Sequence, residues 1–360
     1  MRTISLFGSV PTQRQPIKFG GLFRGQVRDF LFSPDSDRWL SLLRIGLGIE
    51  IVLYSLSLRE DWNRLFARNN TGFLSRELSE AILSIQSPFV PRIGWMVSLG
   101  EQVGLSEQTT LLLAWLLLFG SGSLLIAGVF CRSSAIAAWL LHLCAAKSGE
   151  YLAYGMDNFT TIGLFYLMIA PLPDRYALDW KIWKRPRCDP QILGFHRKVL
   201  QFHLCAIYFF GGITKCLGAG WWNGNSMWRA LTRPPFDIIS IQTLLSWKAA
   251  LPILGIAVCL IETGFPFFIW PKTTRLVWLL SILAMHVAIG FTMGLYLFSL
   301  IMIVLGLAAF GPGAVVLWPG AACCATRSFG VRMKMMPDRP RNRPRRRTYP
   351  KGDRVFLYLR

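Results

Sequence analysis

Residues 202–217 read Phe-His-Leu-Cys-Ala-Ile-Tyr-Phe-Phe-Gly-Gly-Ile-Thr-Lys-Cys-Leu, an apolar run that carries one lysine, Lys215. Several runs in the chain approach or exceed the roughly 20 residues that a helix needs to cross about 30 Å of hydrocarbon. A lysine ammonium inside a membrane span costs free energy, so it is usually retained for a function. Desolvation favours the uncharged amine, which can act as a base or a nucleophile. The run therefore predicts a membrane helix and a candidate reactive group.

The composition indicates a membrane protein. Of the 360 residues, 53% are hydrophobic and only 16% are charged, and the mean hydropathy is positive. A soluble domain carries about 25% charged residues. We therefore expect an all-α fold, a polytopic transmembrane helical bundle with about eight spans. The spans are predicted at 40–58, 109–130, 134–152, 157–173, 198–217, 249–270, 275–293 and 295–318.

The distribution of basic residues tests this number of spans, because cytoplasmic loops are enriched in Lys and Arg. With both termini cytoplasmic, the inside segments hold 28 Lys and Arg, the outside loops hold eight, and three of the 39 lie within spans. We therefore expect an integral multi-pass protein, in the cytoplasmic membrane of a bacterium. Residues 1–38 contain no continuous apolar region of a cleavable signal peptide, so the first span is expected to act as the insertion signal.

Two long loops are predicted on the outer side. In loop 59–108, apolar residues follow roughly helical spacing between Glu77 and Val97, with breaks at Pro88 and Pro91. This pattern is typical of an amphipathic helix that lies on the membrane surface.

The second outer loop, residues 218–248, is rich in tryptophan, with Trp221, Trp222, Trp228 and Trp247. Tryptophan prefers the headgroup level of the bilayer. We expect this loop to dip toward the membrane and to cap a cavity.

The two ends differ in composition from the membrane domain at 36–318. Residues 1–35 are predicted to be a disordered, basic segment, and residues 319–360 a basic cytoplasmic tail. Twelve Lys and Arg fall between Arg327 and Arg360, in a Pro-rich context that cannot form a core. We expect this tail to contact anionic membrane lipids, and we do not expect a nucleic-acid partner.

Ionisable residues within the spans are candidates for structural or functional roles. Arg44 and Glu50 are six residues apart, so each is expected to pair with another helix. Asp157 and Asn158 open the fourth span and suit helix capping. For Lys215 two interpretations stay open: its amine serves a function within the span, or its side chain extends to the lipid headgroups.

No metal site is expected. The eight cysteines form no C-x-x-C pair, and we interpret them as small apolar residues. His203, His286 and Glu262 could converge in space, but their spacing matches no metal-binding motif.

The stretch from Ile207 to Lys215, followed by Trp221 or Trp222 and by Gly-Asn-Ser-Met at 224–227, resembles the central signature of the HTTM family of membrane domains. The vitamin K-dependent γ-carboxylases belong to this family. Further segments within residues 36–312 resemble motifs of this family and follow the same order along the chain. They are Arg44-Ile-Gly-Leu-Gly, Asp157-Asn158, Glu262 with Gly264-Phe-Pro, His286, and Gly294-Leu-Tyr-Leu-Phe-Ser.

The resemblance implies quinone-linked chemistry. In the family's carboxylases, a lysine matching Lys215 deprotonates a reduced quinone, and the quinol anion then reacts with oxygen to give a far stronger base. That base removes a proton from a glutamyl side chain, to which carbon dioxide adds. By this resemblance Lys215 is the base, and His286, Glu262 and Asn158 orient groups around the pocket. Trp221, Trp222 and Tyr208 are the residues expected to contact the quinone.

The chain also departs from the family pattern. Thr214 stands where the carboxylases have a second lysine, and Asn158 stands where they have an active-site histidine. The carboxylases also carry a large extramembrane domain that holds the protein substrate, and this chain has a short basic tail. Carboxylation of a docked protein is therefore not expected.

Two hypotheses follow. The first is a carboxylase-like membrane enzyme, a carbon–carbon lyase that uses a quinol at Lys215 and takes a peptide or small molecule from the outer side. The second is a non-catalytic membrane protein that binds, matures or exports a lipid or peptide. A transporter ranks below both, because the sequence has no inverted repeat.

Overall fold

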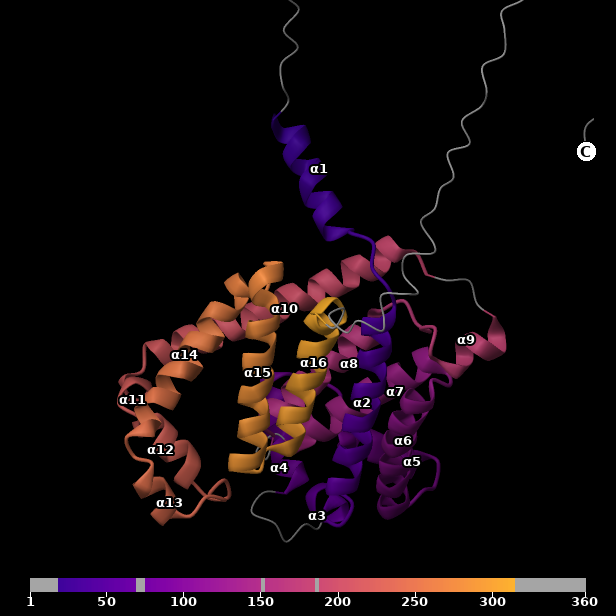
Figure 1. The fold of residues 1–360 in the computed structure, drawn as a ribbon. Coiled ribbons are helices and arrows are strands. Elements are labelled where there is room, and N and C mark those ends of the chain that lie inside the picture. Colours follow the sequence, from indigo (N-terminus) through magenta and orange to yellow (C-terminus); the bar gives the residue numbers. More distant parts are fainter. Residues whose placement is uncertain (1–18, 69–74, 150–152, 185–187, 315–360) are drawn as a thin grey trace, which may run out of the picture. The chain divides into compact units, whose positions relative to one another are not determined.

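The structure is a computed structural model, which describes residues 19–68, 75–149, 153–184 and 188–314, with the side chains of 19–24 and 312–314 left out. These residues form sixteen helices and no strand (Figure 1). The predicted tail at 319–360 lies outside this range. The all-α prediction is confirmed.

Five helices are long and apolar enough to cross a membrane, which makes the chain a helical, multi-pass membrane protein. They are α2 (Arg38–Ser57), α6 (Glu107–Ala127), α10 (Pro190–Cys216), α14 (Ala250–Phe268) and α15 (Lys272–Met293).

The other three predicted spans also coincide with helices: α7 (Cys131–Ser148), α8 (Gly155–Ile169) and α16 (Tyr296–Ala314). At about 1.5 Å per residue, the 15 residues of α8 extend about 22 Å, which is less than the hydrocarbon thickness. That all eight segments cross the membrane stays a prediction, as does the placement of both termini in the cytoplasm.

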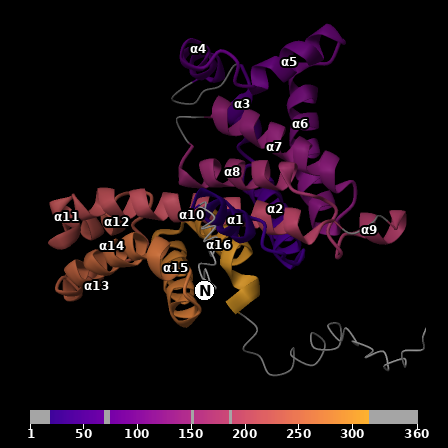
Figure 2. The same ribbon diagram turned by 90° about the horizontal axis from the view of Figure 1, so that it is seen from above.

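The long helices form two neighbouring groups (Figures 1 and 2). In the first, α2 packs against α6, α6 against α7, and α7 against α8; in the second, α10 packs against α14 and α14 against α15. Helix α16 contacts both α2 and α15 and so joins the groups. Glycines permit the tightest approach, since a Cβ added to Gly122 would lie 3.1 Å from the carbonyl oxygen of Gly48.

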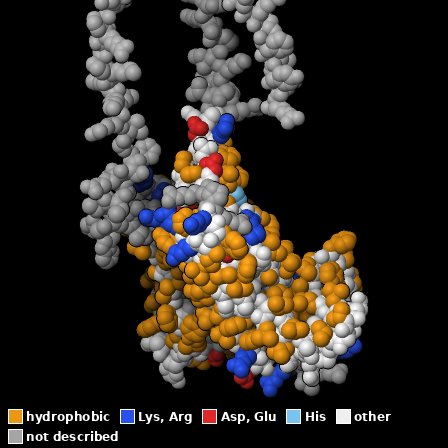
Figure 3. All heavy atoms as spheres, turned by 90° about the vertical axis from the view of Figure 1, so that its right-hand side faces the viewer, with side chains coloured by type: hydrophobic (Ala, Val, Ile, Leu, Met, Phe, Trp, Pro, Cys, Tyr) orange, Lys and Arg blue, Asp and Glu red, His pale blue; other side chains and the backbone are white. Residues whose placement is uncertain are grey.

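The outer surface is largely apolar where it would face lipid. Figure 3 shows one face covered mostly by hydrophobic side chains, with Lys and Arg gathered toward its upper and lower ends. On α6, a group of leucines between 42% and 57% exposed supports this interpretation. They are Leu112, Leu113, Leu116 and Leu117.

Arg44 and Glu50 differ in their environment. The Arg44 Nε atom lies 2.6 Å from Asp174 Oδ2, and its Nη1 donates to carbonyl groups at the end of α6. The predicted pairing of Arg44 with another helix is met by these carbonyl groups of α6, whereas its ion-pair partner Asp174 lies in the segment between α8 and α9. Glu50 is fully buried, and within the described part of the chain neither carboxylate oxygen has a hydrogen-bond partner. The expected pairing of Glu50 is therefore wrong.

The first outer loop contains α3 (Trp62–Phe66), α4 (Arg76–Gln86) and α5 (Ile93–Gln102). The break between α4 and α5 falls at the two prolines, as expected. Helix α4 exposes apolar Leu78 and Ile85 while it buries Arg76 and Ser79. This arrangement suits a helix that turns its apolar side to lipid, and its position on the membrane surface stays a prediction.

Residues before the first span are partly helical. Within the segment 1–35 that was predicted to be disordered, residues 19–31 form α1 (Phe19–Leu31), and residues 1–18 lie outside the described residues. Phe30 in α1 packs against the rings of Phe202 and Trp270, which gives this helix an apolar anchor. A further short helix, α9 (Leu178–Trp183), follows α8.

The tryptophan-rich loop folds into α11 (Ala219–Trp222), α12 (Asn225–Thr232) and α13 (Ile241–Ser246). Residues of α12, α13 and the adjoining loop segments line an apolar cavity of about 370 Å³ together with α14 and α15. The expectation that this loop caps a cavity is confirmed. The cavity lining from the loop comprises Met227, Leu231, Ile239, Leu244 and Trp247.

Candidate functional site

Lys215 lies in the last turn of α10 and forms an ion pair with Glu262 of α14. Its Nζ atom is 2.5 Å from Glu262 Oε2, and the two side chains are 27% and 9% exposed. Each of these side chains is expected to have a counter-ion, because an unpaired charge in an apolar environment costs free energy.

Two glycines bring the helices of the pair together. A Cβ added to Gly212 would run into the backbone of Thr263, the neighbour of Glu262. One added to Gly211 would lie 3.4 Å from Glu262 Oε2 and 3.8 Å from Lys215 Nζ. The Gly-Gly step one turn before Lys215 therefore sets both the helix spacing and the room for the pair.

Trp221 and Trp222 occupy different places. The Lys215 Nζ atom lies 5.6 Å from the ring centroid of Trp221, within the range of a cation–π contact. Trp222 is 47% exposed, and its indole N–H donates to the carbonyl of Cys216 at 2.7 Å. Trp221 is thus part of the candidate site, whereas Trp222 closes the end of α10.

A second, more deeply buried polar pair joins α10 to α15. The hydroxyl of Tyr208, in α10, is 2.8 Å from Nε2 of His286, in α15. The Tyr208 ring packs on Phe265 at 4.6 Å, and the hydroxyl of Ser299 donates to the carbonyl of His286. Both partners are buried, and His286 Nδ1 has no hydrogen-bond partner among the described residues.

The two pairs are close enough to influence each other. Glu262 interacts electrostatically with Tyr208, and Lys215 does so with His286. Hydrogen bonds hold each pair together, and within the described residues none connects one pair to the other. With Trp221, the structure therefore brings together five of the predicted site residues around α10.

Asn158 lies elsewhere. It is an exposed residue of α8, and in the part of the chain that the structure describes its side chain forms no hydrogen bond to the Lys215 group. The neighbouring Asp157 caps the helix by accepting the N–H of Tyr154 at 2.9 Å. A role for Asn158 in orienting a substrate stays a prediction without a contact to support it.

The histidines do not gather into a metal site. The Nδ1 atom of His203 lies 2.8 Å from the hydroxyl of Tyr166, whereas His286 is hydrogen-bonded to a different tyrosine, Tyr208. Across the described ranges there is no group of three or more His, Cys, Asp or Glu side chains arranged to hold a metal ion.

The sequence did not reveal that Glu262 is the partner of Lys215. The two residues are 47 positions apart, and no local pattern links them. One feature of the sequence could have indicated the pair. Lys215 and Glu262 carry opposite charges in separate predicted spans, and each charge needs a partner inside a membrane.

The residues at Lys215 fit the head group of a reduced quinone. A hydrogen-bonding amine, an aromatic face at Trp221 and the unpartnered Nδ1 of buried His286 lie in one neighbourhood. Lys215 keeps 27% of its side chain exposed, so a head group can reach it. Leu217, at the end of α10, is 82% exposed.

The comparisons with known proteins leave the family open: no family model, no curated protein and no solved structure matches this chain. The resemblance to the HTTM family therefore stays a prediction from the sequence.

Proposed function

We propose that this membrane protein binds a reduced quinone beside Lys215 and removes a proton from its hydroxyl group, in a carboxylase-like reaction. The observation that carries the proposal is the Lys215–Glu262 pair, 2.5 Å between Nζ and Oε2, next to the ring of Trp221. A reduced quinone supplies an ionisable hydroxyl and reducing equivalents when bound. The chain's own residues supply the base, its partner and the apolar surroundings.

The pair can prepare the base. Transfer of one proton from the Lys215 ammonium to the Glu262 carboxylate leaves a neutral amine and a neutral carboxylic acid. Low local polarity favours this neutral form relative to two charges, since charge burial is costly. The amine then accepts the proton of the substrate hydroxyl, so an O–H bond breaks and an N–H bond forms at Nζ.

After this step Lys215 is again an ammonium, placed beside the new negative charge. A fixed positive group in a site of low polarity stabilises such a charge more than water-exposed groups do. Tyr208 holds the imidazole of His286 in one orientation through the 2.8 Å hydrogen bond. In the proposal these residues keep the pocket wall rigid and take no proton themselves.

Binding measurements test the proposal. The purified protein in detergent is titrated with reduced and oxidised quinones, in the wild type and in Lys215→Ala. The matched control is Lys198→Ala, which removes another lysine of α10 that lies over aromatic rings, those of Phe30 and Trp270. We expect quinol binding that weakens in Lys215→Ala and persists in Lys198→Ala. A folded wild type that binds no quinone contradicts the proposal.

One observation favours the second candidate, a non-catalytic protein that handles a lipid or peptide. Glu262 already neutralises Lys215, as a purely structural link between α10 and α14 would. The substitution Lys215→Arg separates the two functions, because a guanidinium keeps the charge but stays protonated. A base at this position predicts loss of carbon dioxide incorporation into candidate peptides, whereas a structural link predicts unchanged stability and ligand binding.

A further inference from the structure

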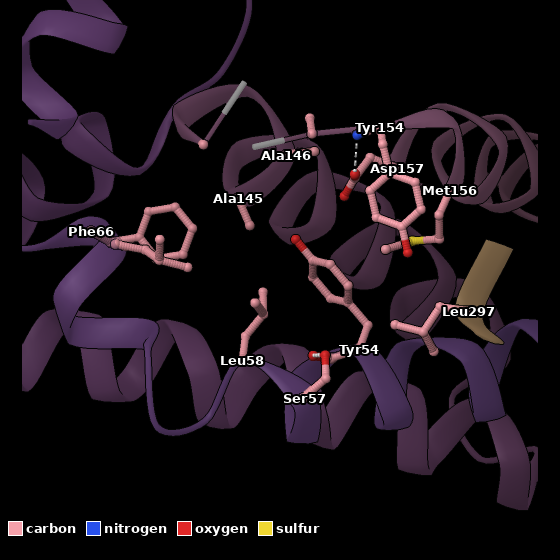
Figure 4. A pocket seen from close by; sticks show the side chains of 13 residues that line it. Tyr54, Ser57, Leu58, Phe66, Ala145, Ala146, Tyr154, Met156, Asp157 and Leu297 are labelled. Carbon is pink, nitrogen blue, oxygen red and sulfur yellow. Dashed lines mark hydrogen bonds between the residues drawn. The ribbon is translucent and has the colours of Figure 1, made fainter. Parts of the chain in front are cut away.

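A second site lies in the other group of helices. A cavity of about 150 Å³ opens between the ends of α2, α7 and α8 (Figure 4). None of its lining residues belongs to α10, α14 or α15, so it is separate from the Lys215 site. A cavity of about this volume can hold a molecule the size of benzene. Its lining includes the aromatic side chains of Tyr54, Phe66 and Tyr154 and the carboxylate of Asp157.

Two oxygen atoms that line this cavity have no hydrogen-bond partner among the described residues. Tyr54 is only 5% exposed, and its hydroxyl points into the cavity and has no hydrogen-bond partner among the described residues (Figure 4). Asp157 uses Oδ2 to cap α8, while Oδ1 lies 4.0 Å from Nε2 of His142, beyond hydrogen-bond distance. A buried hydroxyl and a free carboxylate oxygen thus lie ready for a ligand.

The surroundings are acidic. Glu50 is fully buried close to Asp157, and neither carboxylate forms an ion pair with a lysine or arginine of the described chain. Burial, followed by the charge of Asp157, raises the pKa of Tyr154 to about 12, so this phenol is neutral at physiological pH. The Asp157 carboxylate, beside these aromatic rings, favours a cation.

We propose that this cavity binds a primary ammonium group. The free Oδ1 of Asp157 accepts an N–H of the ligand, and the rings of Tyr54, Tyr154 and Phe66 face its positive charge. The Tyr54 hydroxyl donates to, or accepts from, a polar atom one or two bonds away on the same ligand. The ammonium comes either from a free small amine or from a lipid headgroup, and the experiment distinguishes these sources.

The first arm uses a free amine. Ethanolamine is titrated into the full-length protein in detergent by calorimetry, with tetramethylammonium as a cation that lacks N–H donors. The variants are Asp157→Asn, in which the side-chain oxygen can still cap α8, and Tyr54→Phe, which keeps the ring. The control is Asp61→Asn, which removes a carboxylate that is 55% exposed. Thermal unfolding shows whether each variant is folded.

The second arm uses a lipid. The same variants are placed in nanodiscs of phosphatidylethanolamine or phosphatidylglycerol, and retained lipid is measured by native mass spectrometry. We expect ethanolamine, or phosphatidylethanolamine in preference to phosphatidylglycerol, to bind the wild type and Asp61→Asn. Asp157→Asn is expected to weaken binding about tenfold or more, and Tyr54→Phe a few-fold.

The outcomes separate clearly. Binding of ethanolamine identifies a free amine as the ligand, and selective retention of phosphatidylethanolamine alone identifies the headgroup. The proposal is overturned if the folded wild type binds neither, or if folded Asp157→Asn binds as tightly as the control. Tighter binding of tetramethylammonium than of ethanolamine also overturns the role of Asp157 as a hydrogen-bond acceptor.

Discussion

The Lys215 site and the Asp157 cavity show two ways to place charge inside the same apolar bundle. At α10 and α14, a lysine and a glutamate meet at 2.5 Å and neutralise each other. At α2 and α8, Glu50 and Asp157 lie near each other and no described cation pairs with either. The first arrangement is complete within the chain, while the second lacks a positive charge. This difference underlies the two proposals, which are proton transfer at Lys215 and binding of an ammonium group beside Asp157.

Removing one member of the complete pair has the largest expected effect. Glu262→Gln leaves the Lys215 ammonium without its counter-ion and should reduce the free energy of unfolding by about 3 kcal/mol. Chemical denaturation in detergent measures this change. The double variant Lys215→Met/Glu262→Gln should recover most of the loss, since it removes both charges. If the double variant is no more stable than Glu262→Gln, the two residues are not coupled as described.

The next effect tests whether helix spacing maintains the pair. Gly212→Ala pushes a methyl group into the backbone at Thr263 and should cost about 2 kcal/mol. Gly120→Ala is the control, because a Cβ there meets nothing within 4 Å. Both are measured by the same denaturation assay. Equal stability of the two variants would show that α10 and α14 have room to separate.

A smaller effect is expected at the deeper pair. Tyr208→Phe removes the hydroxyl that contacts His286 and should cost about 1 kcal/mol, because it leaves a buried imidazole nitrogen without a partner. Tyr296→Phe, at a side chain that is 60% exposed, is the control and should be neutral. A thermal unfolding curve for each variant suffices. A neutral Tyr208→Phe would mean that this hydrogen bond adds nothing to stability.

The smallest effect is predicted in the acidic cluster. Glu50→Gln removes a buried carboxylate that has no partner, so stability should stay unchanged or rise by about 1 kcal/mol. The same denaturation assay measures it. This result contrasts with the loss expected for Glu262→Gln, although both variants replace a buried glutamate by glutamine. A marked loss of stability in Glu50→Gln would contradict the account, because it would show that Glu50, like Glu262, makes a stabilising interaction.

The helices themselves were predictable from the sequence. Each of the eight apolar runs overlaps a helix, because an apolar run of this length satisfies its backbone groups internally only as a helix. The tryptophan content of the loop at 218–248 predicted that it caps a cavity, and residues of this loop do line one. Helix α1 was missed, since its anchor at Phe30 depends on Phe202 and Trp270, which are distant in the sequence.

The pairing of polar groups was less predictable. Lys215 was recognised from its apolar setting, but its partner depends on how α10 and α14 pack at Gly212. Glu50 was predicted to pair as Arg44 does, and only the fold shows that its carboxylate oxygens have no hydrogen-bond partner among the described residues. Side-chain pairing across helices is a property of tertiary packing, which one sequence does not encode locally.

The central claim, that Lys215 takes a proton from a quinol, can be tested by ultraviolet absorption of the bound quinol. Phenolate-type anions absorb at longer wavelength than the neutral hydroxyl form. At a pH where the free quinol is neutral, the wild type should shift the absorption of bound quinol to longer wavelength. The folded Lys215→Met/Glu262→Gln variant should leave it unshifted. A wild type that binds the quinol without any shift would contradict the claim.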